Sequence, residues 1–106
     1  MPPAEELERL LTDLESDRLE RKESLGDTDR IRQAICAFAN DLPGHRAPGY
    51  VFIGVTDAGD PSALPITDRL LLTLADMRSD GNILPLPSLT VQRVDLRGGP
   101  VAVVEV

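Results

Sequence analysis

The stretch that most constrains the fold runs from Gly49 to Asp57 and reads GYVFIGVTD. It is an apolar run of strand length, rich in β-branched and aromatic residues, with turn-forming residues before and after it. Uninterrupted apolarity is typical of a strand covered on both faces, so this run predicts a central strand. Gly54 within it predicts a bulge or the close approach of another backbone. Asp57, at the end of the run, suits a turn and is also well placed for chemistry.

Periodic patterns elsewhere predict three helices and three further strands. Helical spacing of apolar residues predicts helices over residues 3–14, 27–42 and 68–80. Weak alternation predicts a strand over 18–24, and two apolar runs predict strands over 89–94 and 101–106, joined by a loop over 95–100. This order predicts an α+β fold, a mixed β-sheet with about three helices packed on it.

In the weak strand the residues alternate between two faces. One face would carry Arg18, Glu20, Lys22 and Ser24, and the other would carry Leu19, Arg21 and Glu23. Both faces are charged, so composition alone favours a loop or a helix here. A local conflict of this kind is where functional residues tend to gather.

The length of 106 residues predicts a single domain over 1–106, with residues 1–14 as its N-terminal helix. The chain stops on an apolar strand, which suggests a module of a longer protein with additional domains. No apolar run reaches 18 residues and no secretory signal opens the chain, so we expect neither a membrane span nor export. A single cysteine, Cys36, excludes an internal disulfide and fits a cytoplasmic location.

Charge is unevenly distributed along the chain. The net charge is −7, and residues 1–29 hold ten acidic and four basic residues, whereas residues 30–106 hold eight and seven. This acidity argues against strong nonspecific binding of nucleic acid, which usually needs a basic surface. The net acidity does not exclude a local patch of arginine, the residue suited to bidentate phosphate contacts.

The sequence motifs that this chain lacks limit the enzyme activities that it could have. The chain has no phosphate-binding loop, dinucleotide fingerprint, zinc-protease motif or nucleophile elbow, so nucleotide hydrolysis and hydride transfer have no support. The constellation that remains is Glu15, Glu20 and Asp57 beside Lys22. Three carboxylates brought together can hold a divalent ion and activate water against a phosphodiester. The alternative is a solvated acidic face.

Four segments in order resemble the Schlafen AlbA-type (divergent AlbA) domain. They are Glu15-Ser16, the run Leu19 to Ser24, the run Ile35-Cys36-Ala37-Phe38-Ala39-Asn40, and the run Val51 to Asp57, followed by a matching last strand, 101–106. The resemblance covers about residues 14–106. It departs from the family pattern at Arg21, where an aromatic is usual, and in the longer loop before the central strand.

The resemblance implies two functions. Most bacterial members are described as DNA-binding parts of transcriptional regulators, which need no cofactor. Some animal Schlafen proteins instead cut transfer and ribosomal RNA with two glutamates and an aspartate, and Glu15, Glu20 and Asp57 fall at roughly matching places.

We therefore expect a nucleic-acid-binding module that is not itself an enzyme. Its candidate phosphate contacts are Arg18, Arg21, Lys22 and Arg46. The alternative is an endoribonuclease that depends on Mg or Mn, with Glu15, Glu20 and Asp57 as catalytic metal ligands and Lys22 steadying the phosphate. A third possibility is a protein-interaction module that forms a homodimer through its final strand or first helix.

Overall fold

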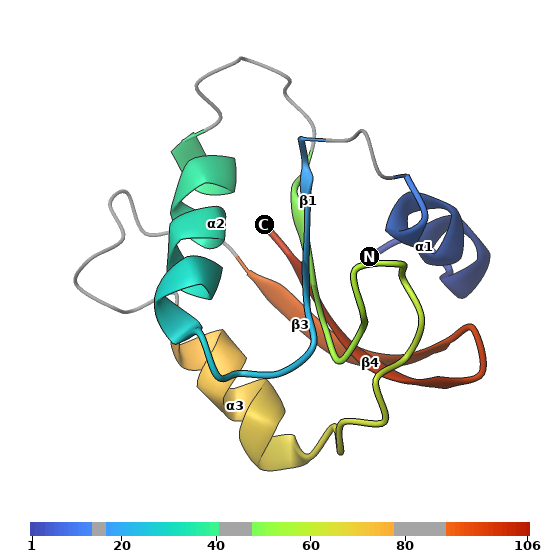
Figure 1. The fold of residues 1–106 in the computed structure, drawn as a ribbon. Coiled ribbons are helices and arrows are strands. Elements are labelled where there is room, and N and C mark those ends of the chain that lie inside the picture. The colour runs from blue at the N-terminus through green and yellow to red at the C-terminus, as the bar shows by residue number, and fades with distance from the viewer. Residues whose placement is uncertain (14–16, 41–47, 78–88) are drawn as a thin grey trace.

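Three helices pack on a four-stranded mixed sheet in the computed structural model (Figure 1), which confirms the predicted α+β class. The structure describes residues 1–13, 17–40, 48–77 and 89–106. In chain order the elements are α1 (Ala4–Leu11), β1 (Leu19–Lys22), α2 (Thr28–Asn40), β2 (Tyr50–Ile53), α3 (Asp68–Asp76), β3 (Thr90–Leu96) and β4 (Gly99–Glu105). Of the helices in these ranges, none is long and apolar enough to cross a membrane.

The sheet has the strand order β1-β2-β4-β3. β1 runs parallel to β2, with Leu19 beside Tyr50, and the other neighbours are antiparallel. β2 is therefore an inner strand, as its apolar run predicts. Gly54 follows it with φ +97°, and the N–H groups of Gly54 and Val55 both donate to the carbonyl of Lys22, at 2.7 and 3.1 Å. This irregular pairing fits the bulge that a glycine at this position predicts.

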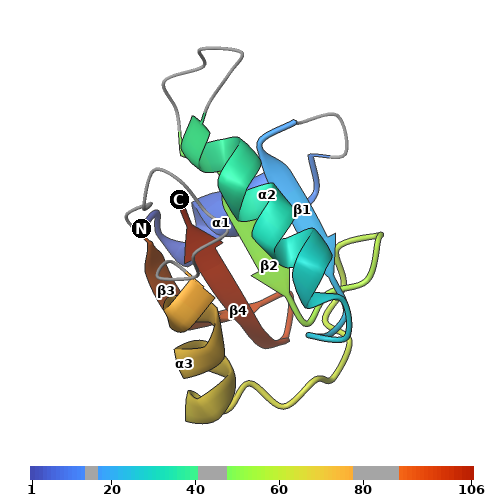
Figure 2. The same cartoon turned by 90° about the vertical axis from the view of Figure 1, so that its left-hand side faces the viewer.

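Each face of the sheet has its own hydrophobic core. α2 and α3 lie over one face (Figure 2), and α1 lies over the other (Figure 1). The first core includes Ile31, Ile35, Phe38, Val51, Ile53, Leu74 and Val104, and the second includes Leu7, Leu11, Leu19, Phe52, Leu96, Val101 and Val103. A sheet covered on both faces explains why β2 is apolar at every position.

Side chains cap the starts of two helices. The Asp27 carboxylate accepts a hydrogen bond from the backbone N–H of Arg30 at 3.1 Å, and the Thr67 hydroxyl accepts one from Leu70 at 3.1 Å. α1 is shorter than predicted, because it ends at Leu11 and Thr12 is its C-cap. Leu14, which the helical spacing included, lies outside the described residues.

The predicted loop over 95–100 is wrong, because β3 and β4 continue through it. Asp95 pairs with Pro100 and Leu96 with Gly99, which leaves a turn of only two residues. Both turn residues, Arg97 and Gly98, have positive φ, at 53° and 88°. Such backbone angles are those of a tight type I′ hairpin turn, which suits the twist of the strands.

The two surfaces predicted for self-association are both used inside the chain. β4 lies between β2 and β3, so both of its backbone edges are already paired. α1 buries Leu7 and Leu11 completely against its own sheet. A homodimer through the final strand is therefore wrong, and the apolar face of α1 is not available either.

Candidate nucleic-acid interface

β1 is the edge strand that carries three of the predicted site residues, Glu20, Arg21 and Lys22, and its two faces differ. Leu19 lies in the core beneath α1, whereas Glu20 and Lys22 are placed by the pairing with Val51 and Ile53 on the face beneath α2. The alternation predicted from the sequence is thereby confirmed. Arg18, one step before the strand, shares the α2 face, because its guanidinium lies over the Phe38 ring.

Arg18 is held in place by two contacts. Its guanidinium carbon lies 5.2 Å from the centroid of the Phe38 ring, and its Nε donates to the carbonyl of Pro48 at 3.4 Å. A cation over an aromatic face is attracted to the ring quadrupole, and the contact limits the rotamers that the long side chain can adopt. Phe38 is a core residue, and nothing in the sequence assigns it this second role.

Lys22 and Glu20 form an ion pair at the surface of the same face. The Lys22 Nζ lies 3.7 Å from Glu20 Oε1, and the side chains are 21% and 29% exposed. Along β1 this face therefore presents a cation, a carboxylate and a second cation. The carboxylate partly neutralises Lys22, and the partial burial of the pair reduces its screening by solvent.

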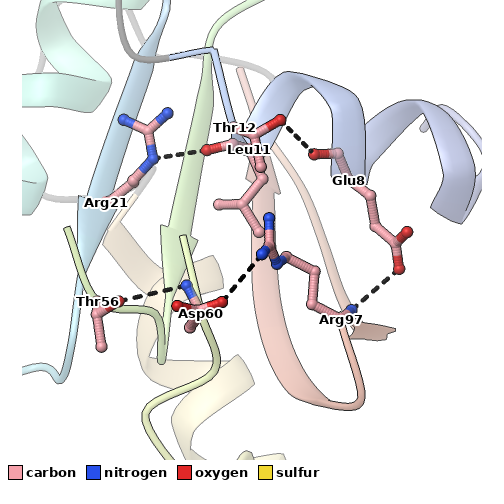
Figure 3. Close-up of polar contacts among 7 residues, drawn as sticks. All are labelled: Glu8, Leu11, Thr12, Arg21, Thr56, Asp60 and Arg97. Atoms are coloured by element: carbon pink, nitrogen blue, oxygen red, sulfur yellow. Dashed lines mark hydrogen bonds and ion pairs between the residues drawn. The ribbon is translucent and has the colours of Figure 1, made fainter. Parts of the chain in front are cut away.

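Arg21 points to the opposite face, where it closes the end of α1 (Figure 3). Its Nε donates to the carbonyl of Leu11 at 2.7 Å, and its Nη2 donates to the carbonyl of Asp13 at 3.0 Å. The last carbonyls of a helix have no partner within the helix, and a cation near them also complements the helix dipole. Arg21 therefore lies on the opposite face of the sheet from Arg18 and Lys22.

Of the predicted acidic trio, Glu20 and Asp57 lie in the described residues. Glu20 lies on β1 beside Val51, whereas Asp57 is exposed in the turn that follows β2. Glu15 lies outside the described residues, as does the phosphate-contact candidate Arg46. In the ranges that the structure describes, no three His, Cys, Asp or Glu side chains form a group that could hold a metal ion. A metal site that includes Glu15 stays a prediction.

A second polar cluster joins three segments on the α1 side (Figure 3). The backbone N–H of Arg97 donates to Glu8 Oε1 at 3.0 Å. The Nη2 atom of Arg97 lies 3.1 Å from Asp60 Oδ1. The Asp60 N–H donates in turn to the hydroxyl of Thr56 at 3.3 Å. This cluster ties the β3-β4 turn to α1 and to the turn that contains Asp57. Sequence reasoning missed it, because its members are far apart along the chain.

Comparison with known proteins identifies the class of this chain. The chain belongs to the Schlafen AlbA_2 family, whose model matches residues 15–106. It is also similar in structure to the N-terminal domain of a RecG-related protein from Nitrosomonas europaea, solved in solution by NMR. The TM-score is 0.70 at 26% sequence identity, and the match covers 98% of this chain and 72% of the other. No curated protein sequence matches significantly.

Proposed function

We propose that this chain is a nucleic-acid-binding module, with DNA as its preferred ligand, and that it belongs to a larger regulatory protein. Membership of the Schlafen AlbA_2 family supports this proposal. So does the similarity to the N-terminal domain of a RecG-related protein, which is named after an ATP-dependent DNA helicase.

The observation that carries the proposal is the pair of cations on one face of an edge strand. Arg18 and Lys22 are four residues apart on the α2 face of β1, which is roughly 13 Å along a strand. Arg18 can bind a phosphate with two parallel N–H donors, and its contact with Phe38 restricts its freedom before binding. Lys22 acts as a point charge at the other end of the face. Arg46 is a further candidate that lies outside the described residues.

The distribution of negative charge favours the same face. The first turn of α1 carries Glu5 and Glu6, and α1 packs on the opposite side of the sheet (Figure 1). A phosphate backbone that approaches β1 from the α2 side is therefore kept away from these acids. Arg21 does not contribute to this interface, because its guanidinium binds the carbonyls at the end of α1.

Fluorescence anisotropy tests the proposal directly. Labelled duplex DNA and hairpin RNA are titrated at low salt with the chain and with Arg18→Ala, Lys22→Ala and the double variant. Arg9→Ala is the matched control, because it removes the same charge from an exposed position on α1, on the other face. We expect the double variant to lose at least about tenfold in affinity and Arg9→Ala to bind like the parent chain. Equal losses in all variants, or no binding by the parent at tens of micromolar, would rule the interface out.

A second candidate is the Mg- or Mn-dependent endoribonuclease. The observation in its favour is that Glu20 lies between Arg18 and Lys22 on one face, so a carboxylate and two phosphate-binding cations are close together. Gels of the same RNA samples with and without manganese test it, with Glu20→Gln as the variant. Cleavage that requires manganese and is lost in Glu20→Gln would support the nuclease, and intact RNA in all samples would exclude it.

A further inference from the structure

Among the described strands, β3 forms an edge of the sheet. It is the last strand in the order β1-β2-β4-β3, and no other described strand pairs with its outer edge. Its register with β4 is continuous from Thr90 to Leu96, without a bulge, and it contains no proline. Soluble proteins usually protect an exposed strand edge with bulges, prolines, charged side chains or a short strand, and of these β3 has only the charges of Arg93 and Asp95, which are opposite in sign. A regular edge of seven residues therefore offers a template for a further strand.

The hairpin geometry shows which residues of β3 offer backbone groups outward. A turn of two residues makes Leu96 and Gly99 a hydrogen-bonded pair, and such pairs alternate along an antiparallel ladder. The even-numbered residues of β3 therefore bond to β4. The odd-numbered residues Val91, Arg93 and Asp95 direct their N–H and C=O groups away from the sheet.

We propose that β3 pairs antiparallel with β3 of a second copy of this chain, about a two-fold axis at Val94. In this register Arg93 lies opposite Asp95 of the second copy, and Asp95 lies opposite its Arg93. Directly opposite side chains of unlike charge stabilise an antiparallel pair, and like charges destabilise it. An axis at Arg93 would oppose two arginines, and one at Asp95 would oppose two aspartates. Charge complementarity therefore selects Val94.

The side chains that would meet are suitably placed. Arg93 and Asp95 are exposed and lie on the same face of β3. The Arg93 Nη1 donates to the carbonyl of Ile66 at 3.1 Å, which fixes the guanidinium beside α3 and leaves further N–H donors for a carboxylate. A two-fold axis makes both contacts at once, because the same patch is used by both copies.

An apolar surface lies beside this edge. Leu72 on α3 is 63% exposed and is the exposed large hydrophobic side chain in the described parts of the chain. With Leu71, Ala75, Val91 and the acidic residue Asp68 it lines a mostly apolar hollow of about 410 Å³ between α3 and β3. Antiparallel pairing keeps both α3 helices on the same face of the joined sheet, so the two hollows would flank the axis. Burying Leu72 there adds a hydrophobic contribution to the charge pairs.

Charge reversal tests the register by sedimentation velocity over a range of concentrations. The parent chain is expected to show a dimer whose population rises with concentration. Asp95→Arg and Arg93→Asp each place like charges at both pairs, so each is expected to raise the dissociation constant by about tenfold or more. A mixture of the two variants is expected to recover the dimer as a heterodimer, because each Arg then faces an Asp. The double variant R93D/D95R is expected to recover it as a homodimer.

The outcome does not depend on the proposed function, since nucleic acid is absent from the experiment. Arg93→Asp loses the bond to Ile66, so its fold is checked by circular dichroism. If it unfolds, Asp95→Arg and Leu72→Gln carry the test, and both should weaken the dimer. A parent chain that is monomeric at several hundred micromolar, or single variants that dimerise like the parent, would overturn the proposal.

Discussion

Arg18 and Arg21 are separated by only two residues, yet the structure gives them different roles. Arg18 lies over Phe38 on the α2 face, and Arg21 binds two carbonyls at the end of α1. Composition cannot separate two arginines that are so close in sequence. The difference arises because successive strand residues point to opposite faces, and one of those faces meets the end of a helix.

Replacement of Arg21 by alanine should reduce stability. Arg21→Ala removes two hydrogen bonds from a charged donor and leaves the carbonyls of Leu11 and Asp13 without it. We expect the free energy of unfolding to fall by about 1–3 kcal/mol. Urea unfolding followed by circular dichroism measures this change, and Arg30→Ala, an exposed arginine on α2, is the matched control. Equal effects of the two substitutions would contradict the capping role.

Tyr50 provides a spectroscopic test of the core beneath α1. Burial raises its pKa to about 12, helped by the hydrogen bond from its hydroxyl to Glu105 at 3.0 Å and by the charges of Glu105 and Glu6. Because the folded pKa exceeds the unfolded value of 10.0, the neutral phenol stabilises the fold fully below pH 10. This contribution is lost as the pH rises from about 10 to about 12.

The titration can be read without interference, because Tyr50 is the only tyrosine and the chain has no tryptophan. Ultraviolet absorbance of the tyrosinate should show a midpoint near 12 in the folded chain and near 10 in denaturant. Glu105→Gln should move the folded midpoint downward, because it removes the adjacent negative charge. A folded midpoint at 10 would show that Tyr50 is solvated.

At the scale of the elements, the start of α3 allows the contribution of a helix cap to stability to be measured. The Thr67 hydroxyl accepts from the N–H of Leu70, so Thr67→Ala should destabilise the chain by about 1 kcal/mol. Thr73→Ala is the same change within the same helix, where the hydroxyl only bonds back to the carbonyl of Arg69 at 2.9 Å. We expect this control to change stability little, since back-bonding of this kind adds nothing to a helix. Thermal unfolding of both variants measures the difference.

Local chemistry predicted the elements well, because it is carried by neighbouring residues. Apolar periodicity predicted all three helices, and an uninterrupted apolar run predicted the inner position of β2. The predicted β3-β4 loop was wrong, because both strands continue up to the two-residue turn although Pro100 has no N–H to donate. Pro100 lies opposite Asp95 in a pair of residues that exchange no backbone hydrogen bonds, so β3 does not need an N–H from residue 100. On the other side of β4, β2 ends opposite Ala102, so β2 does not need that N–H either.

The sequence predicted less of the candidate site than of the fold. Alternation placed Glu20 and Lys22 on one face correctly. It could not show that Arg21 binds the end of α1 or that Phe38 supports Arg18, because both contacts join segments that only packing brings together. The partners of Asp60 and Arg97 depend in the same way on a turn meeting a hairpin.

At the scale of the whole molecule, an acidic chain is proposed to bind a polyanion. The net charge of −7 opposes binding at long range, and the arrangement of elements reduces the effect locally. Glu5 and Glu6 of α1 lie on one side of the sheet, and Arg18 and Lys22 face the other. We therefore expect weak binding that depends strongly on salt and is confined to the β1 and α2 side.

The salt dependence of DNA binding tests this account most directly. Each phosphate contact with duplex DNA contributes about 0.9 to the slope of log affinity against log salt. The account predicts that the double variant R18A/K22A lowers the magnitude of this slope by about two, whereas Arg9→Ala leaves it unchanged. An R18A/K22A slope equal to that of the parent chain would show that Arg18 and Lys22 do not contact phosphates, and would contradict the proposed interface.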